Sequence, residues 1–291
     1  MTASYLERLA ARSAATGTVL CLGLDPDPAA LPRGFSRDVA GVERFAALVL
    51  EAAAPFAAAV KANLAFFEAF GGPGLDALER LRASIPPEVP IIADAKRGDI
   101  GSTAARQAVA LFERLGADAV TVNPYLGGEA IAPLLERQDR FAYVLCRTSN
   151  PGAGELQDLE VGGDPGAGWP PEPLHRRVAR RVAGWGSGRT VGLVVGATAP
   201  AELAAIRSVA PGLAFLVPGV GAQGGDIAPV LDAGPATGEP AGGRPGGGLL
   251  VNVSRGILAA AGPVPDASAG DPGDRLAAAA RAWAARLPVL S

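Results

Sequence analysis

The chain has 291 residues, of which 49% are hydrophobic and 19% charged, and its net charge is −3. The length and apolar content allow a large core in one or two domains, and the charge excludes a broad basic surface for nucleic acid or anionic lipid. Charged residues interrupt the first apolar residues, and no apolar run is long enough to span a bilayer. We therefore expect no signal peptide, no membrane partner and a cytoplasmic location.

Apolar runs predict eight short strands that alternate with helical patterns. The predicted strands span 18–24, 56–60, 89–95, 118–123, 141–146, 190–196, 213–217 and 249–253. The predicted helices span 3–15, 42–54, 64–85 with a break at 71–73, 102–115, 129–137, 173–185, 201–209, 226–231 and 274–287. Apolar strands favour parallel pairing with both faces covered, so these units predict one (β/α)8 TIM barrel over residues 1–291. A doubly wound open sheet is the alternative, although no G-x-G-x-x-G follows the first strand.

Three further features follow from composition. Cys21 and Cys146 lie in apolar runs, which predicts buried, reduced thiols. The Gly/Pro-rich stretch 151–172 follows the fifth strand, so we expect an insertion on the face where strands end, as a candidate lid. The Gly/Pro-rich stretch 233–248 follows a helix, which predicts a mobile connector on the opposite face. His175, the only histidine, begins an Arg-rich helix and is predicted at the surface.

Polar residues collect where the predicted strands end, which is where TIM barrels carry their active sites. These residues are Asp25, Lys61, Asn63, Asp94, Lys96, Asn123, Ser149, Asn150 and Arg255. Of the 26 lysines and arginines, only Lys61 and Lys96 are lysine. Lysine can give up its proton whereas arginine stays charged, so we interpret both lysines as residues that take part in a reaction. Asp94 and Lys96 share one face of their strand, and Asp99 follows a glycine where the chain can turn.

A second polar group follows the last two predicted strands. It contains Pro218, Gly219, Gly221, Gln223 and Arg255. Glycine-rich turns leave backbone N–H groups open to a ligand, and arginine binds phosphate through two parallel hydrogen bonds. The pattern predicts a phosphate site. No His, Cys and carboxylate set has metal-ligand spacing, so we expect no metal.

The segment Asp94-Ala95-Lys96-Arg97-Gly98-Asp99-Ile100, with Lys61 one strand earlier, resembles the orotidine 5′-phosphate decarboxylase family. Residues 218–223 and 254–256 resemble its phosphate grip, while 61–68 and 151–172 resemble the bacterial type 2 subgroup. The resemblance implies a TIM barrel that converts orotidine 5′-phosphate to uridine 5′-phosphate and carbon dioxide without a cofactor, the last step of de novo UMP biosynthesis.

The resemblance also implies roles for individual residues. Lys96 would protonate C6 of the pyrimidine, flanked by Asp94 and Lys61. Across a homodimer interface, the neighbouring site would receive Asp99, Ile100 and Thr103. Asp25 and Lys61 would contact the ribose, Ser149 the pyrimidine, and Gln223 and Arg255 the phosphate. The expected substrate-binding set is completed by Asn63, Asn123, Pro218 and Gly221.

Two alternatives remain open at this point. A metal-dependent sugar-phosphate decarboxylase or isomerase on a related barrel shares the D-x-K-x-x-D pattern, although no glutamate stands beside Asp94 as a metal ligand. A phosphate-binding module without catalysis is the second alternative. It leaves the charged set of Lys61, Asp94, Lys96 and Asp99 unexplained.

Overall fold

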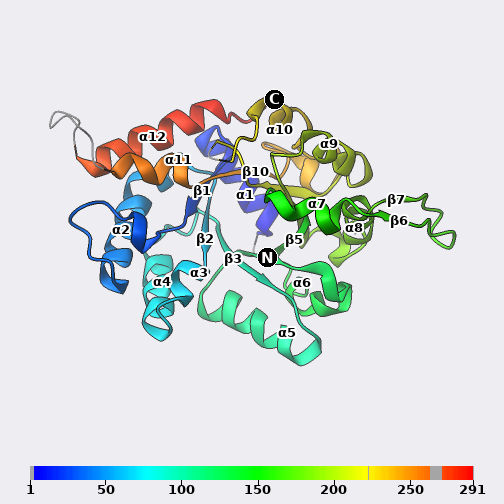
Figure 1. The fold of residues 1–291 in the computed structure, drawn as a ribbon, viewed down its shortest axis with the longest axis horizontal. Coiled ribbons are helices and arrows are strands. Elements are labelled where there is room, and N and C mark those ends of the chain that lie inside the picture. Colours follow the sequence, from blue (N-terminus) through cyan, green and yellow to red (C-terminus); the bar gives the residue numbers. More distant parts are fainter. Residues whose placement is uncertain (1–2, 222, 263–270, 291) are drawn as a thin grey trace.

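The computed structural model describes residues 3–221, 223–262 and 271–290. Within these ranges, eight parallel strands close into a barrel with helices around it (Figure 1), which confirms the predicted fold and excludes the open sheet. The barrel strands are β1 (Leu20–Leu24), β2 (Ala59–Asn63), β3 (Ile91–Arg97), β4 (Ala119–Val122), β5 (Phe141–Arg147), β8 (Val191–Val195), β9 (Ala214–Val217) and β10 (Leu249–Val253). Each pairs with the next along the chain, and β10 closes the barrel onto β1.

Most of the helices lie close to their predicted positions, whereas the short helices at 154–157 and 255–258 were not predicted. The helices are α1 (Tyr5–Thr16), α2 (Val39–Ala53), α3 (Ala65–Glu68), α4 (Gly72–Ser84), α5 (Gly101–Ala108), α6 (Ala132–Leu135), α7 (Gly154–Gln157), α8 (Leu174–Ala183), α9 (Pro200–Val209), α10 (Ile227–Ala233), α11 (Arg255–Leu258) and α12 (Pro272–Arg286). Beyond α5 the chain continues as a π-helical turn, Val109–Arg114. Among the described residues, no helix has the combined length and apolarity needed to cross a bilayer.

Strand β2 begins three residues later than predicted. The chain first makes a 3₁₀ turn, Ala54–Phe56, in which Pro55 lacks the N–H that a strand would use. Consequently Lys61 and Asn63 lie within the strand instead of after it. Because side chains alternate along a strand, both point to the same face.

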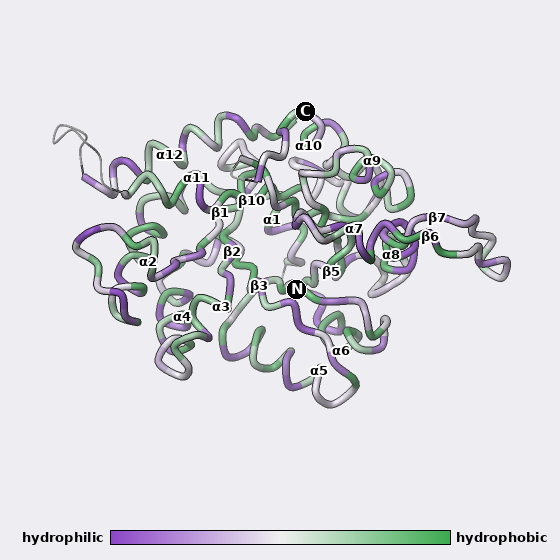
Figure 2. Tube along the Cα trace, in the orientation of Figure 1, coloured by the Kyte–Doolittle hydropathy of each residue, from purple (hydrophilic) through white to green (hydrophobic). Residues whose placement is uncertain are grey.

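Side chains inside the barrel form a core of their own. The inner cluster includes Cys21, Ala59, Ile92, Ala119, Phe141, Tyr143, Val194, Leu216 and Leu250. Neighbouring strand residues such as Val60 and Val120 belong instead to a larger cluster that includes helix residues such as Phe45. Both cysteines are buried and free, as predicted. Figure 2 shows hydrophobic colouring on the strands, in contrast to the largely hydrophilic α8.

The N-terminal end of the barrel is closed by α1, which crosses it in Figure 1. Tyr5 stacks on Phe141 with 4.8 Å between ring centroids, and its hydroxyl is 3.1 Å from that of Tyr143. Segment 233–248 contributes buried Ala236 and Ala241 to the same inner cluster. The segment lies opposite the strand ends and is anchored to the core by these two residues, while its mobility stays a prediction.

Segment 151–172 forms α7 and then a two-stranded hairpin of β6 (Glu160–Val161) and β7 (Glu172–Pro173). The hairpin projects outward from the barrel in Figure 1. Glu172 is buried and accepts hydrogen bonds from Arg177 and Arg180 on α8. The Arg181 guanidinium lies 4.6 Å from the ring centre of Trp169. These contacts fix the hairpin to α8.

Asp118, just before β4, joins the elements at the N-terminal end. It is 3% exposed and accepts hydrogen bonds from the Arg8 side chain at 2.5 Å and from the Ile91 backbone N–H at 2.9 Å. Arg82 and Arg140 add ion pairs at 3.6 Å and 3.8 Å. The Asp118 carboxylate therefore connects α1 and α4 with the first residue of β3 and with the residue that precedes β5.

We expect Asp118→Asn to lower the free energy of unfolding by about 3 kcal/mol, because it removes the charge from a buried, paired site. Urea denaturation measures the loss. Asp139→Asn is the matched control, since Asp139 is a more exposed partner of Arg140 at 3.2 Å and should cost less than about 1 kcal/mol. Equal losses for the two variants would contradict the role given to Asp118.

Candidate active site

A pocket of about 320 Å³ opens at the C-terminal ends of the barrel strands. Of the site residues and segments predicted from the sequence, it is lined by Asp25, Lys61, Asn63, Asp94, Lys96, Ser149, Asn150, Pro218, Gly219, Val220, Gln223, Ser254, Arg255 and Gly256. Leu145, Val194 and Leu216 add apolar side chains from three strands. Among the described residues that line the pocket, none comes from 151–172. The structure therefore gives that segment no lid position.

The charged residues from strands β2 and β3 form one connected cluster. Lys61 Nζ donates to Asp94 Oδ2 at 2.8 Å, and Lys96 Nζ donates to Asp94 Oδ1 at 2.6 Å. Lys61 Nζ is also 3.8 Å from Asp25 Oδ1. The Lys61 side chain is 6% exposed, whereas that of Lys96 is 50% exposed. Asp94 thus lies between a buried amine and an amine that faces the pocket.

Burial and charge act against each other in this cluster. Burial alone would raise the pKa of Asp94, but Lys61 and Lys96 outweigh it and hold the pKa of this carboxyl well below its usual range. Burial would lower the pKa of Lys61, but Asp25 and Asp94 reverse the effect and raise the pKa above its ordinary value. Both groups are therefore charged at neutral pH.

Several pocket residues were not singled out as site residues from the sequence. They are Thr121, Leu145, Thr148, Val194, Leu216 and Asn252. The alternation of side chains along a strand, with a period of two residues, could have identified Thr121 and Asn252. Residues 119 and 121 share one face of β4, so the polar Thr121 continues the row that begins with the inner Ala119. The same period places Asn252 above Leu250 on β10.

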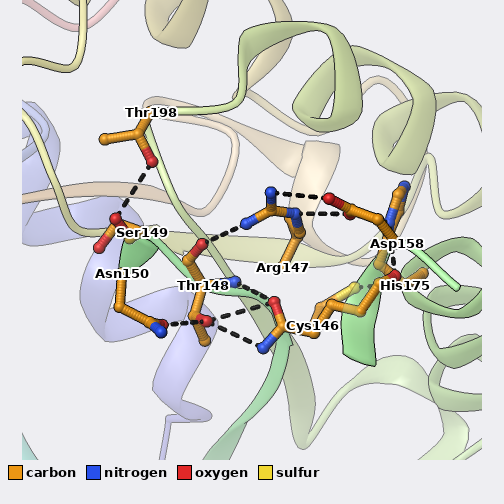
Figure 3. Close-up of polar contacts among 9 residues, drawn as sticks. Cys146, Arg147, Thr148, Ser149, Asn150, Asp158, His175 and Thr198 are labelled. Atoms are coloured by element: carbon orange, nitrogen blue, oxygen red, sulfur yellow. Dashed lines mark hydrogen bonds and ion pairs between the residues drawn. The ribbon is translucent and has the colours of Figure 1, made fainter. Parts of the chain in front are cut away.

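The loop after β5, which carries Ser149, is held by α7 (Figure 3). Gln157 Oε1 accepts the Thr148 backbone N–H at 2.8 Å, and Gln157 Nε2 donates to Thr148 Oγ1 at 2.9 Å. On the other side, Thr198 Oγ1 donates to the Ser149 carbonyl at 3.3 Å. The base of segment 151–172 therefore fixes a pocket loop, although the segment does not cover the pocket.

His175 is part of this support and is 3% exposed, so its predicted surface position is wrong. Its Nδ1 lies 2.9 Å from the Gln157 carbonyl and 3.2 Å from Asp158 Oδ1. Asp158 in turn accepts two hydrogen bonds from Arg147 at the end of β5 (Figure 3). The polar helix start suggested exposure, but the chain folds back over the ring.

The expected phosphate residues surround the ends of β9 and β10. Gly219 lines the pocket with φ +102°, and a Cβ there would lie 2.9 Å from the Ser149 side chain. Gly221 does not line the pocket, because it faces α12, where a Cβ would lie 3.0 Å from Trp283. Trp283 also donates to the Gly256 carbonyl at 3.1 Å. One tryptophan thus supports both glycine-containing turns.

Four other predicted residues lie outside this pocket. Asn123 accepts the Tyr125 N–H at 3.0 Å and so caps the turn after β4. Asp99, Ile100 and Thr103 continue away from the pocket into α5. Ile100 is 62% exposed. In the described parts of the chain, no three His, Cys, Asp or Glu side chains converge as metal ligands.

The chain is similar to a well-defined set of proteins. The sequence model of the "Orotidine 5'-phosphate decarboxylase / HUMPS family" matches residues 18–269. The orotidine 5′-phosphate decarboxylase of Thermomicrobium roseum is 47% identical over 285 residues, which cover 98% of this chain and 93% of the relative. That of Herpetosiphon aurantiacus is 46% identical over 259 residues, covering 89% and 90%. The structure of Leishmania donovani OMP decarboxylase aligns with a TM-score of 0.78 at 37% identity, covering 97% and 96%.

The cluster predicts a pH-dependent cost for Asp94→Asn. Without this carboxylate only Asp25, at 3.8 Å, still opposes the effect of burial among the two acids described above. We expect burial to outweigh it and to lower the pKa of Lys61 below that of an unfolded chain, about 10.4. The unfolded variant then binds more protons than the folded one, so its stability rises with pH. In the wild type the pKa of Lys61 is raised. The stability that this ammonium gives to the folded chain is therefore complete from neutral pH to about pH 10 and is lost only above about pH 10.

Urea denaturation should give a loss of about 3 kcal/mol at neutral pH that shrinks towards about pH 10. Asp76→Asn, at an exposed position of α4, is the control and should show no such trend. A gap that widens with pH would contradict the pairing of Asp94 with Lys61.

Proposed function

The chain belongs to the orotidine 5′-phosphate decarboxylase / HUMPS family, and we propose that Lys96 is the acid of its reaction. The chain is an enzyme that decarboxylates orotidine 5′-phosphate to uridine 5′-phosphate and carbon dioxide. The observation that carries the assignment is the contrast between the two lysines. Lys61 is buried between two acids, whereas the half-exposed Lys96 ammonium reaches the pocket from the same carboxylate.

The chemistry requires such a group. When the bond from C6 to the carboxylate breaks, its electron pair remains on C6 as a carbanion with little delocalisation. An ammonium beside C6 stabilises this charge as it develops and then delivers a proton, which Lys96 regains from solvent. Asp94 Oδ1 accepts a hydrogen bond from Lys96 Nζ at 2.6 Å, which holds the amine at the pocket. We propose that the reaction needs no metal and no organic cofactor.

We propose one orientation for the substrate in the pocket. In our proposal the phosphate binds Arg255 and Gln223, and the pyrimidine contacts Ser149. The ribose contacts Asp25 and Lys61, with Asn63 and Pro218 completing the lining. Binding at the phosphate, remote from C6, supplies energy that organises the reacting end. The volume of about 320 Å³ is at the lower end of the range for small-molecule sites.

The two alternatives are weaker. The curated relatives described above are named orotidine 5′-phosphate decarboxylases, and a metal-dependent sugar-phosphate enzyme finds no support among them. A binding module without catalysis would not need a buried lysine paired with two acids, since burying an amine is costly unless it is paired. The cluster is explained by chemistry on a bound nucleotide.

We propose that the enzyme is a homodimer in which each chain contributes Asp99, Ile100 and Thr103 to the partner's site. The loops after β3 and β4 lie together, because the Asp99 N–H donates to the Ala130 carbonyl at 3.4 Å. The loops expose Ile100 at 62% and Tyr125 at 87%. Large apolar side chains exposed beside a charged group support a protein interface there.

Lys96→Ala should abolish turnover of orotidine 5′-phosphate, because Lys61, the other lysine of the pocket, is buried and held between Asp25 and Asp94. Ultraviolet absorbance follows the conversion, with a chelator present throughout. Binding of uridine 5′-phosphate should persist, since the phosphate and ribose contacts remain. Turnover by Lys96→Ala near the wild-type rate would remove Lys96 from its role, and a wild type that loses activity with the chelator would contradict the metal-free reaction.

Mixing two inactive variants tests the shared site. A dimer of one Lys96→Ala chain and one Asp99→Ala chain has one site with both residues intact, if Asp99 serves its partner. When equal amounts of the two variants exchange chains at random, about half of the dimers are mixed, and each mixed dimer has one intact site of two. About a quarter of wild-type activity should therefore return. Activity that stays at the level of the separate variants, while mixed dimers form, would show that Asp99 acts within its own chain.

A further inference from the structure

Lys96 has an unusual backbone conformation. Strand β3 pairs with β4 at Ala93 and Val120 and again only at Arg97 and Val122, so β3 carries two extra residues between these points. Within this bulge Lys96 has φ +47°, one of two positive values at non-glycine residues in the described ranges. A side chain with a Cβ disfavours this region, so other contacts must hold Lys96 there.

Thr121, on β4 opposite the bulge, makes these contacts. The Lys96 backbone N–H donates to Thr121 Oγ1 at 3.0 Å, and the Thr121 hydroxyl donates to Asp94 Oδ1 at 2.8 Å. An N–H can only donate, so the oxygen of Thr121 accepts there and its single hydrogen is available to the carboxylate. Thr121 is 2% exposed and lines the pocket. Its hydroxyl therefore joins the backbone of Lys96 to the carboxylate that its ammonium contacts.

We propose that Thr121 is a positioning residue for proton delivery, which fixes the Lys96 ammonium relative to Asp94 and to C6 of the substrate. The proposal rests on the roles given above to Lys96 and Asp94. Asp94 Oδ1 receives both the Thr121 hydroxyl and Lys96 Nζ. Without the hydroxyl, the bulge loses the acceptor for its N–H and the carboxylate loses a donor. Small displacements of a catalytic group cost much in rate, because the reacting atoms must be aligned.

Thr121→Val tests the idea, since valine keeps the shape and removes both hydrogen bonds. We expect kcat to fall about 100-fold, while KM and the Kd of uridine 5′-phosphate change less than about threefold, because phosphate and ribose contacts are untouched. Thr121→Ser keeps the hydroxyl and should restore kcat to within about fivefold of wild type. Thr190→Val is the matched control, because Thr190 is fully buried outside the pocket.

The outcomes separate positioning from mere support of the fold. If Thr121→Val keeps kcat within about threefold of wild type, or if the serine variant is impaired as severely as the valine variant, the proposal is overturned. Should Thr121→Val not fold, Thr121→Ala replaces it. A serine-to-alanine ratio of kcat of about ten or more then supports positioning, and a ratio near one overturns it. Wild type without turnover in the same assay would instead refute the activity itself.

Discussion

A lysine ammonium inside a protein must be paired, and the buried Lys61 imposes this requirement on the whole site. Its counterions are Asp94 on the next strand and Asp25 after the first strand. Asp94 then also holds Lys96 and the Thr121 hydroxyl. Four neighbouring strands must therefore end in register for the charges to balance. An unpaired buried charge costs several kcal/mol. The ion pairs therefore favour this register of the strands, and the register in turn brings the charged groups together.

The interior of the barrel changes from apolar to polar along the barrel axis. Towards the N-terminal end it is filled by aromatic and aliphatic side chains, including Tyr143, whose hydroxyl lies 3.1 Å from that of Tyr5 on α1. Towards the C-terminal end the inward positions become polar at Lys61, Thr121 and Asn252. The closed apolar end excludes water from below, and low-dielectric surroundings strengthen the interactions of the charges above. Packing far from the pocket therefore contributes to its electrostatics.

The sequence predicted what depends on local pattern. Apolar runs gave the barrel strands, and the rarity of lysine marked Lys61 and Lys96. Features that depend on how elements meet were missed. Thr121 is unremarkable in sequence, because its importance comes from a bulge in the neighbouring strand. His175 was placed at the surface because its helix is polar, but the chain that covers it precedes that helix. For Gly221, sequence predicted the turn correctly but not the direction it faces.

The catalytic residues and the substrate-binding residues come from different kinds of element. Lys61 and Asp94 pair with neighbouring strands, which leave little freedom to the backbone. Lys96 lies in the bulge of β3, where its N–H is held by Thr121 of β4. The groups assigned to the substrate's ends lie on loops supported from outside the barrel. Ser149, for example, is held by Thr198, just before α9, and its neighbour Thr148 is held by Gln157 of α7. A rigid catalytic cluster keeps the proton donor aligned, while loops anchored at their bases can adjust to the nucleotide. Sequence change in the outer supports should therefore alter binding before it alters the chemical step.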